Sequence, residues 1–159
     1  MKTLFSISLF FISLGLMAQY QLGRLTVYGK VKHKTGIVGN VNLEVYKDNE
    51  LSKELVNYKN GSFKLELPLG SIYSITFKKE GYIEKSVAVI AKTDSLNRVN
   101  GRFFFQLDIE LFKSEENSVD ESILPPVAKL YIKNQNSGFK YDKKYVKWVA
   151  EEYEEELTD

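Results

Sequence analysis

Residues 60–77 read NGSFKLELPLGSIYSITF, and the alternation within this stretch decides the fold. The opening pair, Asn60-Gly61, predicts a tight hairpin turn, because both residue types tolerate the positive φ angles that such a turn needs. Apolar side chains then occupy every second position from Phe63 to Leu67, and again from Tyr73 to Phe77. Successive side chains of a strand point to opposite faces, so each half of the stretch is expected to be a strand with one buried face.

The same alternation continues on both sides of this stretch. It predicts seven strands in all, near residues 24–32, 41–45, 51–58, 63–67, 73–77, 82–91 and 103–111. Short strands that follow one another at this spacing, with turn residues between them, are typical of a two-layer sandwich. The chain is therefore predicted to be all-β, with residues 19–112 forming a seven-stranded antiparallel β-sandwich.

The remaining chain is expected to form a C-terminal extension. Residues 113–126 are polar and end in Pro125-Pro126, which predicts a linker. Residues 127–159 are predicted to hold one further strand, at 127–133, and an amphipathic helix at 143–156 with Asp142 as its N-cap. Lysines at the start of this helix and glutamates at its end oppose the helix dipole, so packing must hold it in place. That packing is either on the chain's own sandwich or on a partner.

Residues 1–18 have the pattern of a secretory signal peptide. Lys2 precedes an apolar run from Leu4 to Met17, and Ala18 suits cleavage before Gln19. The run is about 14 residues long, short of the roughly 20 that span a bilayer as a helix. We therefore expect an exported protein of the periplasm or cell surface, with no transmembrane segment after cleavage. The chain has no cysteine, which excludes disulfides, thiolate metal sites and cysteine nucleophiles.

The charge is distributed unevenly along the chain. Acidic side chains crowd residues 151–159, which leaves residues 19–150 with a net positive charge. The lysines of this body occupy outward strand positions, where solvation accounts for them without any partner. No nucleic-acid-binding motif accompanies them, so we expect no nucleic-acid partner.

Several of these segments together resemble the carboxypeptidase regulatory-like domain, a family with a transthyretin-like β-sandwich. The resemblance rests on residues 29–31, 39–45, 60–63, 69–75 and 79–82, and it covers about Leu25 to Ile90. It implies no peptidase activity, because known members are mostly accessory or recognition modules of exported and envelope proteins. The Ala18-Gln19 signal end on a lysine- and asparagine-rich chain also looks like exported proteins of Bacteroidetes.

The sequence offers little for catalysis. His33 is the only histidine, and it stands between lysines in an expected loop, where we predict an exposed and structurally neutral side chain. Asp108 and Glu110 share the outward face of one strand at a separation that would suit glycoside hydrolysis. Solvated acids are the simpler interpretation of this pair. Asp48-Asn49-Glu50 is expected to be a turn rather than a calcium loop. We predict no enzyme, no metal and no cofactor.

The predicted contact surface is aromatic. Four rings, those of Tyr28, Tyr46, Phe104 and Phe112, have outward parity and could form a docking patch or a carbohydrate-stacking platform, unless the C-terminal segment covers them. The helix adds Val146, Trp148, Val149 and Tyr153. We expect a non-enzymatic envelope module that contacts another envelope or cell-surface protein, chiefly through its C-terminal elements. A carbohydrate-binding module is the alternative, and a carboxylate-dependent hydrolase the less favoured one. Asp94-Ser95-Leu96 resembles a short O-glycosylation signal.

Overall fold

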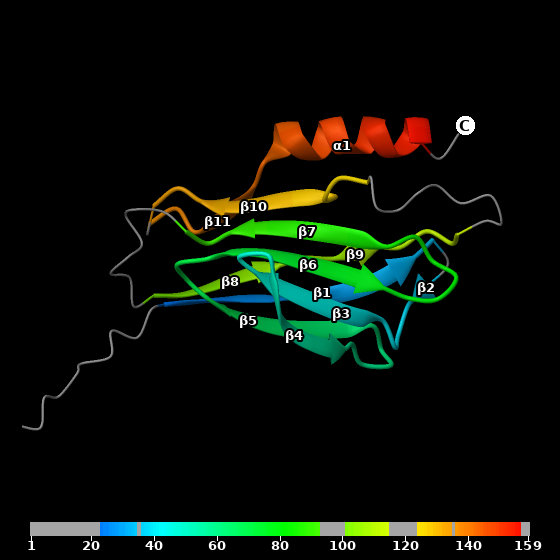
Figure 1. Ribbon diagram of the computed structural model, residues 1–159, viewed down its shortest axis with the longest axis horizontal. Coiled ribbons are helices and arrows are strands. Elements are labelled where there is room, and N and C mark those ends of the chain that lie inside the picture. Colours follow the sequence, from blue (N-terminus) through cyan, green and yellow to red (C-terminus); the bar gives the residue numbers. More distant parts are fainter. Residues whose placement is uncertain (1–22, 35, 93–100, 115–123, 135, 157–159) are drawn as a thin grey trace, which may run out of the picture.

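The structure is a computed structural model that describes residues 23–34, 36–92, 101–114, 124–134 and 136–156. The expected signal peptide at 1–18 and the Ser95 signal lie outside these residues. The described chain forms two β-sheets that face each other, with one helix along their edge (Figure 1).

The first sheet is built around its longest strand, β1 (Arg24–His33). Along one side of β1 lie β5 (Ser62–Pro68) and the short β2 (Gly36–Ile37), both antiparallel to it. Along the other side lie β8 (Arg102–Gln106) and β9 (Ile109–Glu110), both parallel to it. The sheet is therefore three strands wide.

The second sheet has six strands in the order β11-β10-β7-β6-β3-β4. Its antiparallel part comprises β3 (Asn42–Lys47), β4 (Glu50–Val56), β6 (Ile72–Lys78) and β7 (Lys85–Ile90). Beyond β7 come β10 (Ala128–Ile132), which runs parallel to it, and β11 (Phe139–Tyr141). The segment after residue 126 thus belongs to the same sandwich, although the boundaries drawn from the sequence stay a prediction.

The sandwich and its mainly β character agree with the prediction, but the seven-stranded antiparallel arrangement was wrong. Eleven strands are described, and β1/β8, β1/β9 and β7/β10 are parallel pairs. Alternation predicts which face a side chain occupies, and this pattern is the same for either strand direction. The run predicted at 103–111 is also interrupted, because residues 107 and 108 leave the ladder between β8 and β9.

The core lies between the two sheets and follows the predicted parity. Leu25, Val27, Leu65, Ile75 and Phe77 are all at most 1% exposed. Phe63 and Phe77, one from each sheet, meet edge to face with ring centroids 5.3 Å apart. Such a pair adds about 1 kcal/mol to the effect of burial alone.

The turn at Asn60-Gly61 differs from the expected hairpin. Only Gly61 has a positive φ, of 74°, and its N–H donates to Tyr58 O at 2.8 Å. The connection joins β4 of one sheet to β5 of the other, so it is a corner rather than a hairpin between paired strands. The two-residue turn with two positive φ angles occurs instead at Asp48 (48°) and Asn49 (72°), between β3 and β4.

Asn57 holds this corner together. Its side chain is buried, and Oδ1 accepts a hydrogen bond from Val41 N at 2.7 Å. Its Nδ2 donates to Val38 O at 2.9 Å and to Gly61 O at 3.1 Å. One amide therefore bonds to backbone groups on both sides of the corner, at Val38 and Val41 before β3 and at Gly61 before β5.

The helix α1 (Lys143–Glu156) begins where it was predicted. Asp142 is its N-cap, because Oδ1 accepts hydrogen bonds from Lys144 N and Tyr145 N, both at 3.1 Å. Val149 and Tyr153 are buried, and Val146 packs against the core. The helix, which runs beside β10 in Figure 1, therefore packs on its own sandwich.

We predict that Asn57→Ala lowers the free energy of unfolding by about 3 kcal/mol, because it removes the side-chain partner of the Val41 N–H and of the Val38 carbonyl. Urea denaturation measures the change. Asn60→Ala is the matched control, since the Asn60 side chain makes its exposed hydrogen bonds only to Ser62 in the same turn. Equal losses for the two variants would contradict the role given to Asn57.

Candidate functional site

Two of the four predicted aromatic residues, Tyr28 and Phe104, lie on the outer face of the first sheet. They belong to the neighbouring strands β1 and β8, where Tyr28 pairs with Gln106 and Phe104 pairs with Thr26. Their rings are thus diagonal neighbours on one surface. Phe104 is 66% exposed and Tyr28 is 41% exposed. Both are available to a partner.

The other two rings lie elsewhere. Tyr46 is on the outer face of the second sheet, on the opposite side of the sandwich, and its hydroxyl donates to Glu44 Oε2 at 2.8 Å. Phe112 is half-buried beneath the ammonium of Lys85. The four outward rings therefore do not form one platform.

The predicted residues of α1 are also divided. Val146, Val149 and Tyr153 face the sandwich and are part of its packing. Trp148 is exposed, with the ring of Tyr145 at a centroid distance of 5.7 Å. Only Trp148 of this group lies open to solvent.

Charged side chains surround Tyr28 and Phe104. We define the β1–β8 face as the outward side chains of β1, β5, β8 and the adjoining residue 108: Arg24, Tyr28, Lys30, Lys32, Lys64, Glu66, Arg102, Phe104, Gln106 and Asp108. Its two acids are both engaged by cations, Glu66 by Arg24 at 3.3 Å and Asp108 by Lys32 at 2.6 Å. The face is thus aromatic at its centre and net positive around it.

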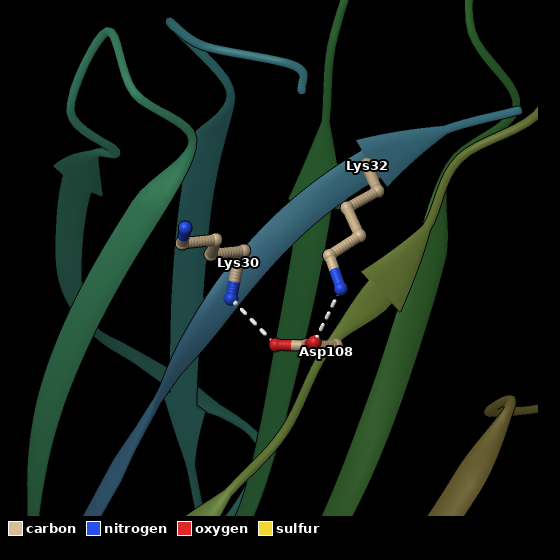
Figure 2. A network of polar contacts seen from close by, with 3 residues as sticks. All are labelled: Lys30, Lys32 and Asp108. Carbon is tan, nitrogen blue, oxygen red and sulfur yellow. Dashed lines mark hydrogen bonds and ion pairs between the residues drawn. The ribbon is translucent and has the colours of Figure 1, made fainter. Parts of the chain in front are cut away.

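Asp108 lies in the two-residue interruption between β8 and β9 and bonds to β1. Figure 2 shows its carboxylate between two residues of β1: Oδ1 accepts a hydrogen bond from Lys30 N at 3.0 Å, and Oδ2 pairs with Lys32 Nζ. The break also depends on Gly29, since a Cβ there would lie 1.8 Å from Leu107 O. The carboxylate replaces the backbone acceptor that the interrupted ladder lacks.

This arrangement gives Asp108 a structural role. The hydrogen bond from Lys32, with that from Lys30 N, lowers the pKa of Asp108 below its ordinary value although partial burial acts against it. A general acid of a glycosidase needs a raised pKa instead. Glu110, the other carboxylate predicted from the sequence, is exposed on β9. Both carboxylates therefore lie on the exposed surface, Asp108 in an ion pair with Lys32.

Lys85 is the buried charge that sequence reasoning missed. It is 7% exposed at the start of β7, and its Nζ lies 3.7 Å from the centroid of the Phe112 ring and 5.6 Å from that of Tyr153. Burial lowers the pKa of Lys85 from 10.5 to about 8, partly opposed by the charge of Glu110. The parity of Lys85 with Val87 and Val89 was the one signal in the sequence.

His33 also differs from its prediction. It ends β1 rather than lying in a loop, and it is half-buried. Its Nδ1 lies 2.9 Å from Leu111 O, and its ring meets that of Tyr82 edge to face at 5.8 Å. His33 therefore links β1 to the segment after β9. The prediction of an exposed side chain with no structural role was wrong.

No group of three or more histidine and acidic residues that could hold a metal ion occurs among the described residues. At the Asp48 turn, the carboxylate accepts a hydrogen bond from Ile72 N at 3.0 Å, which lowers the pKa of Asp48. This acid is therefore engaged in joining the β3–β4 turn to β6. Within the same described ranges, no helix is long and apolar enough to cross a membrane.

The sequence matches no known family profile and no curated protein. Solved structures similar to this chain include 3-chlorocatechol 1,2-dioxygenase from Rhodococcus opacus, at 15% identity and a TM-score of 0.44, covering 61% of this chain and 62% of that one. A DUF3823 family protein from Parabacteroides merdae matches at 17% identity and a TM-score of 0.40, over 58% of this chain and 47% of that one.

A third similar structure is 5-hydroxyisourate hydrolase from Klebsiella pneumoniae, at 12% identity and a TM-score of 0.38, over 57% of this chain and 98% of that one. The chain spans less than two thirds of the dioxygenase and of the DUF3823 protein. All three TM-scores lie below 0.5, so the family assignment stays a prediction from the sequence.

We predict that Lys85→Met removes a pH dependence of stability. The unfolded chain binds this proton up to about pH 10.5 and the folded chain only up to about pH 8. The free energy of unfolding of the native protein should therefore increase as the pH rises between these values, by at most about 3 kcal/mol. Thermal unfolding of both proteins at pH 7 to 10.5 measures the difference, with exposed Lys64→Met as control. Parallel pH profiles of the native and Lys85→Met proteins would overturn the assignment.

We predict that Asp108→Asn is mildly destabilising at pH 7, by less than about 1 kcal/mol, because the ion pair is more than a third exposed. A depressed folded-state pKa stabilises the protein above the unfolded value and loses this effect as the pH falls through the folded one. The difference in Tm between native and variant should therefore vanish once the pH lies below the lowered pKa of Asp108. A difference that persists there would show that charge is not its cause. Glu50→Gln, at the β3–β4 turn, serves as control.

Proposed function

We propose that this chain is an exported, non-enzymatic binding module of the carboxypeptidase regulatory-like, transthyretin-like type, which acts through protein contacts in the periplasm or at the cell surface. The contact surface would be the β1–β8 face. The observation that carries this proposal is the exposure of Tyr28 and Phe104 side by side on one sheet face. Adjoining exposed rings on a regular strand surface are suited to anchor a partner.

The charge of this face suggests the chemistry of the partner. Arg102 adjoins Arg24 in the strand register, and Lys64 adjoins Tyr28. Since Glu66 and Asp108 are both engaged by cations of the same face, a partner that brings carboxylates would find unmatched positive charge around the two rings. We therefore propose an acidic protein surface as the partner.

The C-terminal elements are less suited to the contact role expected for them. β10 pairs with β7, and the apolar stripe of α1 packs on the core, so removing residues 127–159 would expose the sandwich interior. Trp148 on α1 remains an exposed aromatic side chain outside the β1–β8 face. The main contact is therefore assigned to β1 and β8.

A glycan ligand is the second candidate, and one observation favours it. Tyr28 and Phe104 are near enough on adjacent strands to stack against a saccharide chain. The platform would consist of these two rings alone, because Tyr46 lies on the opposite face and Phe112 lies beneath Lys85. Cations beside the rings would then select an acidic glycan.

We predict that Phe104→Ser and Tyr28→Ser each weaken partner binding by at least about tenfold, because each removes an exposed ring at the centre of the contact. Affinity capture from envelope extracts at low and high salt measures retention, and a glycan array measures saccharide binding. Tyr58→Ser is the matched control, since Tyr58 is 69% exposed in the β4–β5 corner and is not one of the residues that define this face.

The outcomes separate the candidates. Loss of a captured protein for Phe104→Ser but not for Tyr58→Ser, with weaker capture at high salt, is the expected result. Loss of glycan binding instead would favour the second candidate. Unchanged capture by both ring variants would end the assignment of this face.

A further inference from the structure

The backbone of β8 has one edge on β1 and one edge facing away from it. At the two ends of the pairing, Arg24 N donates to Gly101 O and Leu107 N donates to Tyr28 O, both at 2.9 Å. In a parallel ladder, alternate residues of a strand bond to the same neighbour. The odd-numbered residues from 101 to 107 therefore bond to β1, and the backbone groups of Arg102, Phe104 and Gln106 point to the opposite edge.

That opposite edge has no paired strand within the described chain. β8 pairs with β1 alone there, and β11, the nearest strand of the other sheet, pairs with β10. The ring contacts between β11 and β8 lie on the inner side. The ring centroids of Phe103 and Phe139 are 5.8 Å apart, and those of Phe105 and Tyr141 are 4.9 Å apart. These ring contacts lie on the inner face of β8. The backbone groups of its unpaired edge lie in the plane of the sheet and point away from β1.

We propose that β8 receives an extended, acidic segment of the partner protein as an added strand. This inference rests on the proposed function and names how the partner would be held. Backbone N–H and C=O groups of Arg102, Phe104 and Gln106 would pair with the segment, as in other cases of strand addition. Unpaired strand edges are templates for such pairing, and β8 carries no proline that would block it.

The side chains around this edge define the segment. Its outward side chains would lie beside Arg102, which favours acidic residues on that side. Its inward side chains would lie beside Phe105 and Tyr141, which favours apolar residues at alternate positions. Arg24, one strand further in, extends the positive charge, so a chain of like charge would be rejected. The inference therefore commits to a segment that alternates apolar and acidic residues.

The test uses the mature chain and a synthetic seven-residue peptide that alternates valine and glutamate. NMR amide exchange with and without the peptide gives the direct readout. Exchange at Arg102, Phe104 and Gln106 should slow on binding. Exchange at Phe103, Phe105 and Leu107 should stay unchanged, because β1 already protects these amides. A charge-reversed peptide, with lysine in place of glutamate, should not bind.

A matched pair of variants separates backbone pairing from side-chain contact. Gln106→Pro removes an N–H that faces the free edge, so the sandwich should keep it, whereas Gln106→Ala removes only the side chain. We expect at least about fivefold weaker binding for Gln106→Pro than for Gln106→Ala, the equivalent of one lost hydrogen bond. Thermal unfolding checks that both variants fold. If Gln106→Pro does not, Arg102→Pro against Arg102→Ala makes the same comparison.

The results distinguish this inference from the proposed function. Equal binding by the proline and alanine variants, with no slowed exchange, would overturn strand addition. If Phe104→Ser still abolished partner capture, the β1–β8 face would stand as a contact surface. If neither the proline variant nor Phe104→Ser had an effect, both proposals would fail. Binding of an acidic glycan in place of the peptide would also overturn strand addition.

Discussion

The three hydrogen bonds of the buried Asn57 amide hold the corner at which the chain passes from one sheet to the other. Val41 begins the β3 region, Val38 precedes it, and Gly61 leads into β5. Without that amide, the Val41 N–H and the Val38 carbonyl would lose this partner, at a cost of about 1–3 kcal/mol each, whereas the Gly61 carbonyl would still accept from Val31 N. Because β5 pairs with β1, the same corner positions the sheet that carries the β1–β8 face.

A second constraint acts at the other side of β1. Parallel strands cannot be joined by a tight turn, and here β8 pairs with β1 although strands β2 to β7 lie between them in the sequence. The pairing with β1 is interrupted at residues 107 and 108, where the Asp108 carboxylate accepts a hydrogen bond from Lys30 N. Gly29, which has no Cβ, leaves room for the Leu107 carbonyl. This break ends β8 after five residues. Within the described chain, the result is a short unpaired edge next to exposed rings, and the proposed strand addition depends on this edge.

Catalysis and binding place different demands on such a surface. A catalytic carboxylate needs an environment that shifts its pKa toward its task, whereas Asp108 is held ionised by the strand beside it. The strongest shift in the described chain toward a neutral form belongs to Lys85, which lies between Phe112 and Tyr153 rather than on the β1–β8 face. There the ammonium joins the end of α1 to the sandwich, so its environment is explained by packing.

Local pattern by itself determined the faces of the strands, the helix and its Asp142 cap, because side-chain parity and capping depend on near neighbours in the chain. It also placed Tyr28 and Phe104 outward. Strand direction, the corner at Asn60-Gly61 and the environments of His33 and Lys85 were decided only in the tertiary structure. These depend on which distant segments meet: Leu111 reaches His33, and Phe112 and Tyr153 enclose Lys85. A free edge on β8 is likewise visible only once its neighbours are known, since the residues of a paired strand and of an unpaired one follow the same alternation.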